Sequence, residues 1–128
     1  MKRPAPIRPA QSPDPRHTLG KQAEEMAAEA YLGRGARIVA RNFRARGGEL
    51  DLVVEEAVGD LVIVEVRART SGGWVSAAES VDWRKRKKIL HTAQLFLMKY
   101  RGPACAVRFD LYCWDGIRVD WVRNIRLD

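Results

Sequence analysis

Two short apolar runs in this sequence carry acidic residues at positions where buried strands normally carry apolar ones. Residues 48–54 read GELDLVV and residues 61–67 read LVIVEVR, so Asp51 and Glu65 interrupt otherwise strand-like patterns. A glycine-containing loop of hairpin length joins the runs. If the hairpin is centred near Val58, Asp51 lies opposite Glu65 with the two Cβ atoms about 5 Å apart. The same register places Glu49 opposite Arg67.

Two carboxylates at such a spacing repel each other unless a proton or a cation lies between them. Oxygen ligands suit Mg²⁺ or Mn²⁺, so we expect one or two such ions bound by Asp51 and Glu65. Glu49, Glu24 or the carbonyl of Val66 is the candidate third ligand. A metal ion so placed polarises a phosphate and activates water, which is the chemistry of phosphodiester hydrolysis.

The charge balance of the chain favours a polyanionic partner. The net charge is +7 and the pI is about 9.9, which points to nucleic acid before an anionic membrane. No apolar run is long enough for a membrane span, no apolar stretch follows the N-terminal basic residues, and the only two cysteines are eight residues apart. We therefore expect a cytoplasmic protein without a membrane partner.

Periodicity predicts one domain after a tail. Residues 1–17 hold five of the six prolines and are expected to be disordered. Thr18 can cap a helix over 19–34, and a strand over 37–43 precedes the two acidic strands. A second helix follows Ser80 or Asp82 and ends near residue 101, and strands over 105–114 and 117–122 flank a tight Asp115-Gly116 turn. The expected fold class is therefore α/β (α+β), with a mixed central sheet flanked by helices over residues 18–128.

Basic residues surround the acidic strands and are the candidates for binding DNA. Within a run of five cations on the second helix, Arg84, Lys87 and Lys88 share one side. Cations near a helix N-terminus oppose the helix dipole, which favours a role facing an anion. Trp74 could stack on a base or pack over the core. The full candidate set is Arg41, Arg44, Arg46, Arg69, Arg84, Lys85, Lys87 and Lys88.

The motifs GELDLV and VIVEVRAR resemble the G-E-I-D-L-I and F-V-E-V-K-x-R motifs of the YraN-like family of uncharacterised bacterial proteins. The resemblance runs from about Leu19 to the last strand and includes LGK with Glu24, ARNFR, AESV with the basic run, and Arg108-Phe109-Asp110. The ordered combination is specific, although each motif alone is weak.

That family is similar to the restriction-endonuclease-like superfamily with its PD-(D/E)XK metal site, and within it to archaeal Holliday-junction resolvases. The resemblance implies an α-β-β-β-α-β core and Mg²⁺-dependent endonuclease activity on branched or otherwise structured DNA. By motif position Asp51 and Glu65 are its two carboxylates, and Glu24 is the additional acid on the first helix. Junction-cutting relatives are dimers, which implies a homodimer.

Arg67 stands where the superfamily motif has lysine, which leaves open whether the chain is an enzyme. Arginine keeps the positive charge but cannot accept a proton. Lys85, Lys87 or Lys88 could supply a migrated lysine. One alternative is a nucleic-acid-binding module that keeps the nuclease fold without hydrolysis. The other is a protein-interaction domain whose acidic pair is structural, held by a shared proton or by Arg67.

Overall fold

The computed structural model describes residues 15–68, 83–102 and 106–127 of the chain. Arg69, Trp74 and the expected helix caps Ser80 and Asp82 lie outside these residues. The predicted order of helix, three strands, helix and two strands is confirmed. The elements are α1 (Pro15–Gly33), β1 (Arg37–Ala45), β2 (Gly48–Glu55), β3 (Leu61–Ala68), α2 (Trp83–Lys99), β4 (Val107–Trp114) and β5 (Val119–Val122).

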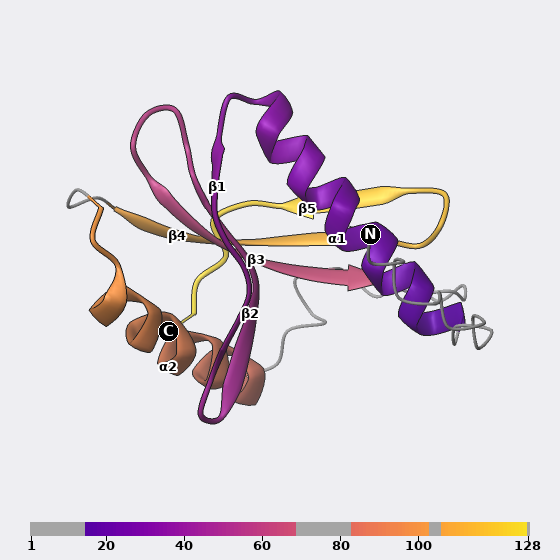
Figure 1. Ribbon diagram of the computed structural model, residues 1–128. Helices are drawn as coiled ribbons and strands as arrows, with labels where there is room; N and C mark the ends of the chain where they lie inside the picture. Colours follow the sequence, from indigo (N-terminus) through magenta and orange to yellow (C-terminus); the bar gives the residue numbers. More distant parts are fainter. Residues whose placement is uncertain (1–14, 69–82, 103–105, 128) are drawn as a thin grey trace, which may run out of the picture.

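The five strands form one mixed sheet in the order β1-β2-β3-β4-β5. Neighbouring strands are antiparallel except β3 and β4, which are parallel and are joined by the segment that contains α2. The two helices lie on opposite sides of the sheet (Figure 1). This arrangement confirms the α/β (α+β) class.

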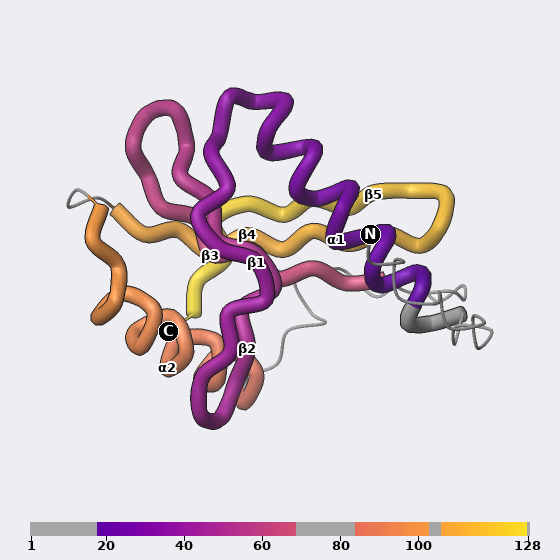
Figure 2. The backbone as a smooth tube through the Cα atoms, viewed as in Figure 1, coloured from indigo at the N-terminus to yellow at the C-terminus, as the bar shows by residue number. Residues whose placement is uncertain are grey.

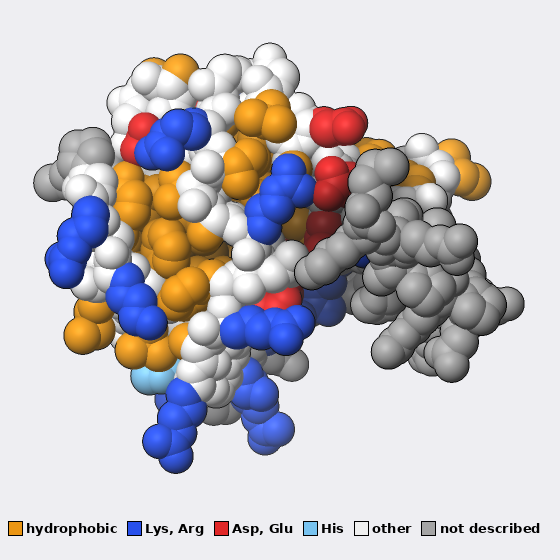
Figure 3. Space-filling model, viewed as in Figure 1, with side chains coloured by type: hydrophobic (Ala, Val, Ile, Leu, Met, Phe, Trp, Pro, Cys, Tyr) orange, Lys and Arg blue, Asp and Glu red, His pale blue; other side chains and the backbone are white. Residues whose placement is uncertain are grey.

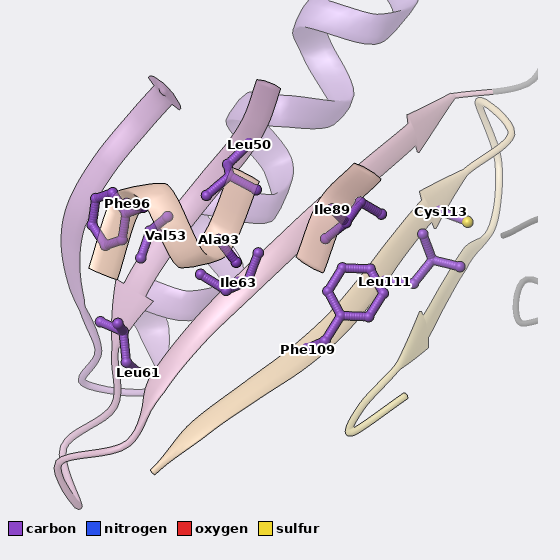
Figure 4. Close-up of a cluster of buried hydrophobic side chains, with 10 residues drawn as sticks. All are labelled: Leu50, Val53, Leu61, Ile63, Ile89, Ala93, Phe96, Phe109, Leu111 and Cys113. Atoms are coloured by element: carbon purple, nitrogen blue, oxygen red, sulfur yellow. The ribbon is translucent and has the colours of Figure 1, made fainter. Parts of the chain in front are cut away.

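The central strand β3 explains both layers of the core. Its run Leu61-Val62-Ile63-Val64 is buried on both faces, as expected for a strand with a helix on each side. Leu61 and Ile63 point toward α2, as Figure 4 shows, and Val62 and Val64 pack toward α1. The buried cluster on the α2 side comprises Leu50, Val53, Leu61, Ile63, Ile89, Ala93, Phe96, Phe109, Leu111 and Cys113.

Helix α1 approaches the other face through small side chains. Ala23, Ala27 and Ala28 are almost fully buried, and Tyr31 continues this stripe one turn later. Small residues at this spacing let the helix lie close to the sheet. The buried cluster on this side is Ala27, Ala28, Tyr31, Ala36, Leu52, Val54, Val62, Val64 and Tyr112.

Several predicted boundaries were wrong by two residues or more, two of them for reasons visible in the structure. Helix α1 begins at Pro15, within the segment expected to be disordered, rather than after Thr18. Proline suits the first helical position because the N–H group that it lacks would have no partner there. The returning strand β5 begins at Val119 rather than residue 117. The Asp115 carboxylate accepts hydrogen bonds from the N–H groups of Ile117 and Arg118, which extends the turn beyond Asp115-Gly116.

The backbone trace in Figure 2 makes the course of the β1–β2 hairpin plain: it runs past the rest of the sheet toward the first turns of α2. Neither described helix is long and apolar enough to span a membrane.

Candidate active site at the fork between β2 and β3

Strands β2 and β3 stop pairing with each other at the two acidic residues. Their paired residues run from Glu55↔Leu61 to Leu52↔Val64, which is the predicted register. Beyond that point β2 continues to pair with β1, and β3 continues to pair with β4. Figure 1 shows β2 running on with the hairpin while β3 turns away along β4. Asp51 and Glu65 are therefore the first residues past the last β2–β3 pair, at a fork in the sheet.

The fork also changes which face the start of β2 covers. Regular strand alternation would place Leu50 on one face with Leu52 and Val54. Instead, Leu50 packs in the cluster beneath α2, whereas the other two pack toward α1. Two-stranded ribbons twist more strongly than wide sheets. The free hairpin can therefore rotate its end toward α2, where Leu50 is buried.

Asp51 closes the fork with its side chain. Its Oδ2 atom accepts a hydrogen bond of 2.9 Å from the N–H group of Val66, which takes the place of a strand-to-strand bond. Burial, the charge of Glu65, a hydrogen bond between the two carboxyl groups and the charge of Glu24 together raise the pKa of Asp51 to about 7. Asp51 therefore retains its proton up to near-neutral pH, and Glu24 contributes to this from α1.

A cavity of about 520 Å³ opens on this fork between the hairpin and α2. Its α2 side is formed by side chains at helical spacing, which places them on one face of the helix. Gly48 permits the close approach of the hairpin, because a Cβ atom there would collide with the hydroxyl group of Thr92. The described lining residues are Gly48, Glu49, Asp51, Glu65, Arg84, Lys85, Lys88, Ile89 and Thr92.

Lys85 reaches from α2 into the acidic pair. Its Nζ atom lies 2.9 Å from Oε1 of Glu65. The Glu65 side chain is only 10 % exposed, whereas that of Lys85 is 37 % exposed, so the lysine approaches from the solvent side. The sequence had grouped Lys87 with Arg84 and Lys88, but Lys85 is the residue that joins those two at the cavity.

The structure contradicts the expected pairing of Glu49 with Arg67. Glu49 lies opposite Arg44 across the β1–β2 hairpin, with 3.3 Å between the Glu49 carboxylate and Arg44 Nε. Arg67 lies opposite Cys113 of β4. The strands that carry Glu49 and Arg67 have already separated at the fork, which is why the register could not be extended to them.

The basic candidates that the structure describes divide into three groups. Arg41 lies 2.8 Å from Glu25 and Arg44 is paired with Glu49, so their charges are partly neutralised. Arg46 is exposed at the hairpin end, and Lys87 is exposed on α2. In Figure 3, Lys and Arg side chains gather over the hairpin end and the neighbouring end of α2. Arg84, Lys85 and Lys88 line the cavity itself.

The two carboxylates at the fork suit a metal ion that takes most of its ligands from water and substrate, such as Mg²⁺ or Mn²⁺. They are too few for a site built from protein ligands alone. Within the described ranges, no three acidic, histidine or cysteine side chains are grouped to hold a metal ion, so Glu49 and Glu24 do not complete a cluster with Asp51 and Glu65. Mg²⁺ is commonly bound by one or two carboxylates, with water and substrate phosphate as its remaining ligands. Asp51 and Glu65 beside an open, cation-lined cavity fit that pattern.

A second polar cluster lies in the core between α1 and β4. Asp110 is fully buried and accepts hydrogen bonds from the Tyr31 hydroxyl (2.7 Å), Arg108 Nε (2.9 Å) and the Asn124 N–H group (2.9 Å). Arg108 also binds Glu56 at 2.6 Å. Burial and the Asp110 carboxylate raise the pKa of Tyr31. The available signal was the position of Asp110 between Phe109 and Leu111 in a strand-like run. Its hydrogen-bond partners indicate a structural network.

The comparisons with known proteins give a family. The family model described as "Uncharacterised protein family UPF0102" matches residues 23–113. A UPF0102 protein of Burkholderia thailandensis is 50 % identical over 103 residues, which cover 80 % of this chain and 71 % of the relative. A UPF0102 protein of Ralstonia nicotianae is 39 % identical over 119 residues, covering 91 % and 92 %. These matches confirm the resemblance to YraN-like proteins, and the chain belongs to the uncharacterised protein family UPF0102.

Proposed function

We propose that this protein is a metal-dependent endonuclease that hydrolyses phosphodiester bonds in branched or otherwise structured DNA. The observation that carries the proposal is that Asp51 and Glu65 lie together in the lining of a cavity whose other side carries three cations of α2. The helix–three strands–helix–strand order agrees with the restriction-endonuclease-like superfamily. We extend the proposal to membership of that superfamily.

Each side of the cavity has a part in the proposed reaction. Asp51 and Glu65 would hold Mg²⁺ or Mn²⁺, and when bound the ion polarises the phosphate and lowers the pKa of a bound water. Arg84, Lys85 and Lys88 would attract and orient the phosphate backbone. Val66 fixes the orientation of Asp51 through its N–H group. Glu24 adds negative charge from α1, which favours a cation at the pair.

The deciding experiment is a cleavage assay with the full chain. Labelled four-way junction, flap, nicked, duplex and single-stranded DNA would be incubated with Mg²⁺ or Mn²⁺ and with Asp51→Asn or Glu65→Gln protein. Each substitution should lower cleavage by a factor of about 10² or more, because it removes a ligand worth several kcal/mol to the transition state. Glu29→Gln is the matched control, since it removes an exposed carboxylate of α1 outside the cavity. Cleavage that persists in Asp51→Asn, or its absence in the wild type with both metals, would refute the proposal.

Arg67 favours a second candidate, a nucleic-acid-binding module without hydrolysis. An arginine at the motif position keeps a positive charge for phosphate but cannot act as a base. This candidate predicts salt-dependent DNA binding with no product in the same assay. An Arg67→Lys variant that gained cleavage would show that the motif lysine is the missing catalytic element. Loss of DNA binding even at low salt would exclude the module.

A further inference from the structure

We infer that Lys85 is the exchangeable counter-ion of the acidic pair, which a divalent cation displaces so that the lysine ammonium becomes available to a phosphate of the substrate. This inference rests on the proposed function and assigns to α2 the cationic group that the motif normally carries on β3. It follows from the position of Lys85, from its exposure and from the surrounding charges.

The position of Lys85 makes it a direct competitor of a metal ion. Its ammonium lies 2.9 Å from Oε1 of Glu65. A carboxylate oxygen that binds Mg²⁺ is approached to about 2.1 Å by the ion. The Lys85 ammonium, at hydrogen-bond distance from the same oxygen, would then be repelled by the double positive charge of the metal ion at close range. The two cations therefore exclude each other at Glu65, and one of them must leave.

Exposure decides which of the partners can move. The Glu65 side chain is nearly buried, and its strand is held on the β4 side by the parallel pairing of Glu65 with Leu111. Lys85 is more than a third exposed and has a flexible four-carbon stem anchored in the third position of α2. Its head group can therefore swing into the cavity without moving the helix backbone.

The cavity gives the displaced ammonium a destination. Arg84 and Lys88 line the same cavity, so an anion that enters it is already attracted there. A phosphate bound beside the acidic pair would lie between these cations and the metal ion. Lys85 would then form a charge-assisted hydrogen bond to that phosphate instead of to Glu65. Metal binding and phosphate binding are thereby coupled through one side chain.

The coupling predicts opposite effects of one substitution. Lys85→Met keeps most of the side-chain volume but removes the charge. It should tighten Mg²⁺ or Mn²⁺ binding about fivefold, which corresponds to the loss of a partly exposed ion pair. Ca²⁺ replaces Mg²⁺ in the binding assay so that the DNA is not cleaved, and it should raise the DNA affinity of the wild type. The Lys85→Met variant should lose this gain in DNA affinity. Lys99→Met is the matched control, because it removes the same charge from an exposed site at the far end of α2, outside the described cavity lining.

The test combines calorimetric titration of metal with fluorescence anisotropy of a labelled DNA junction, on full-length protein whose folding is checked by circular dichroism. Tighter metal binding together with the lost Ca²⁺ effect in Lys85→Met, and neither change in Lys99→Met, is the expected result. Unchanged or weaker metal binding in Lys85→Met would overturn the inference, as would a Ca²⁺ effect equal to that of the wild type. Lys85→Gln serves if the methionine variant does not fold. Failure of the wild type to bind any divalent metal would instead refute the proposed function itself.

Discussion

The N–H group of Val66 donates a hydrogen bond to Asp51 Oδ2 across the fork between β3 and β2, with 2.9 Å between the two atoms. The bond places a carboxylate where an antiparallel ladder would otherwise continue. It keeps one oxygen of Asp51 occupied and directs the remainder of the carboxyl group toward Glu65 and the cavity. The position of the acidic pair is thus a consequence of how the sheet divides.

The stability of the metal-free protein should fall between about pH 4 and pH 7. The pKa of Asp51 is raised from 3.8 to about 7 by burial, by Glu65 and by Glu24. In that window the unfolded chain releases the Asp51 proton while the folded protein retains it, so stability decreases as pH rises and levels off above pH 7. The difference between the two pKa values corresponds to at most about 4 kcal/mol. Urea unfolding across this range should show the slope in the wild type and lose it in Asp51→Asn. A slope that survives in Asp51→Asn would place its origin elsewhere.

The Glu24→Gln substitution should move this window downward. The negative charge of Glu24 helps to raise the pKa of Asp51, so its removal lowers that pKa. The upper end of the stability slope should shift by less than about one pH unit, because Glu24 is the smallest of the named causes. If Glu24 also serves the reaction, cleavage should decline about tenfold in the same variant. Glu25→Gln, one position along the exposed side of α1, should change neither quantity.

The Gly48→Ala substitution should destabilise the protein by about 1–3 kcal/mol. The added Cβ atom would collide with the Thr92 hydroxyl, which itself donates a hydrogen bond of 2.9 Å to the Lys88 carbonyl. Chemical denaturation would measure the loss. In a Thr92→Ala background the colliding atom is absent, so the same glycine substitution should cost less than about 1 kcal/mol. Equal costs in both backgrounds would show that the contact between the hairpin and α2 is not what requires glycine.

The Tyr31→Phe substitution should cost about 1–3 kcal/mol of stability. It removes the hydroxyl that donates to Asp110 and accepts a 2.9 Å hydrogen bond from Trp121 Nε1, leaving buried polar groups short of partners. Thermal denaturation would measure the effect. Tyr112→Phe is the matched control in the same cluster, since the Tyr112 hydroxyl makes no hydrogen bond with the described residues. A comparable loss in the control would indicate packing rather than hydrogen bonding.

The salt dependence of DNA binding should separate the cations that line the cavity from Arg41, which is paired with Glu25. Arg84→Gln and Lys88→Gln should each reduce the slope of log K against log salt concentration by about 0.9 for duplex DNA, the contribution of one phosphate contact. Arg41→Gln should leave the slope almost unchanged, because Arg41 is already paired with Glu25. Anisotropy titrations between about 50 and 200 mM salt would measure the slopes. A larger effect of Arg41→Gln than of Lys88→Gln would move the DNA-binding surface to the hairpin.

Local patterns in the sequence were sufficient for the elements and for the acidic pair. Alternation in residues 48–54 and 61–67 predicted two strands, and the loop between them set a register that the structure confirms up to Leu52↔Val64. Helical spacing predicted both helices, although α1 begins earlier than the proline content suggested. These features depend on neighbours within a few residues or across one hairpin, which is why they can be read from the chain alone.

What only the tertiary structure decided is how the charges are distributed around the pair. The register of one hairpin could not reveal that β3 stops pairing with β2 before Glu65 and continues along β4 alone, so it wrongly set Glu49 against Arg67. It also could not show that Lys85, rather than Lys87, faces the cavity beside Arg84 and Lys88. Both outcomes depend on where α2 and β4 dock against the sheet. Docking is set by burial of apolar side chains far apart in the sequence, so it lies beyond any local periodicity.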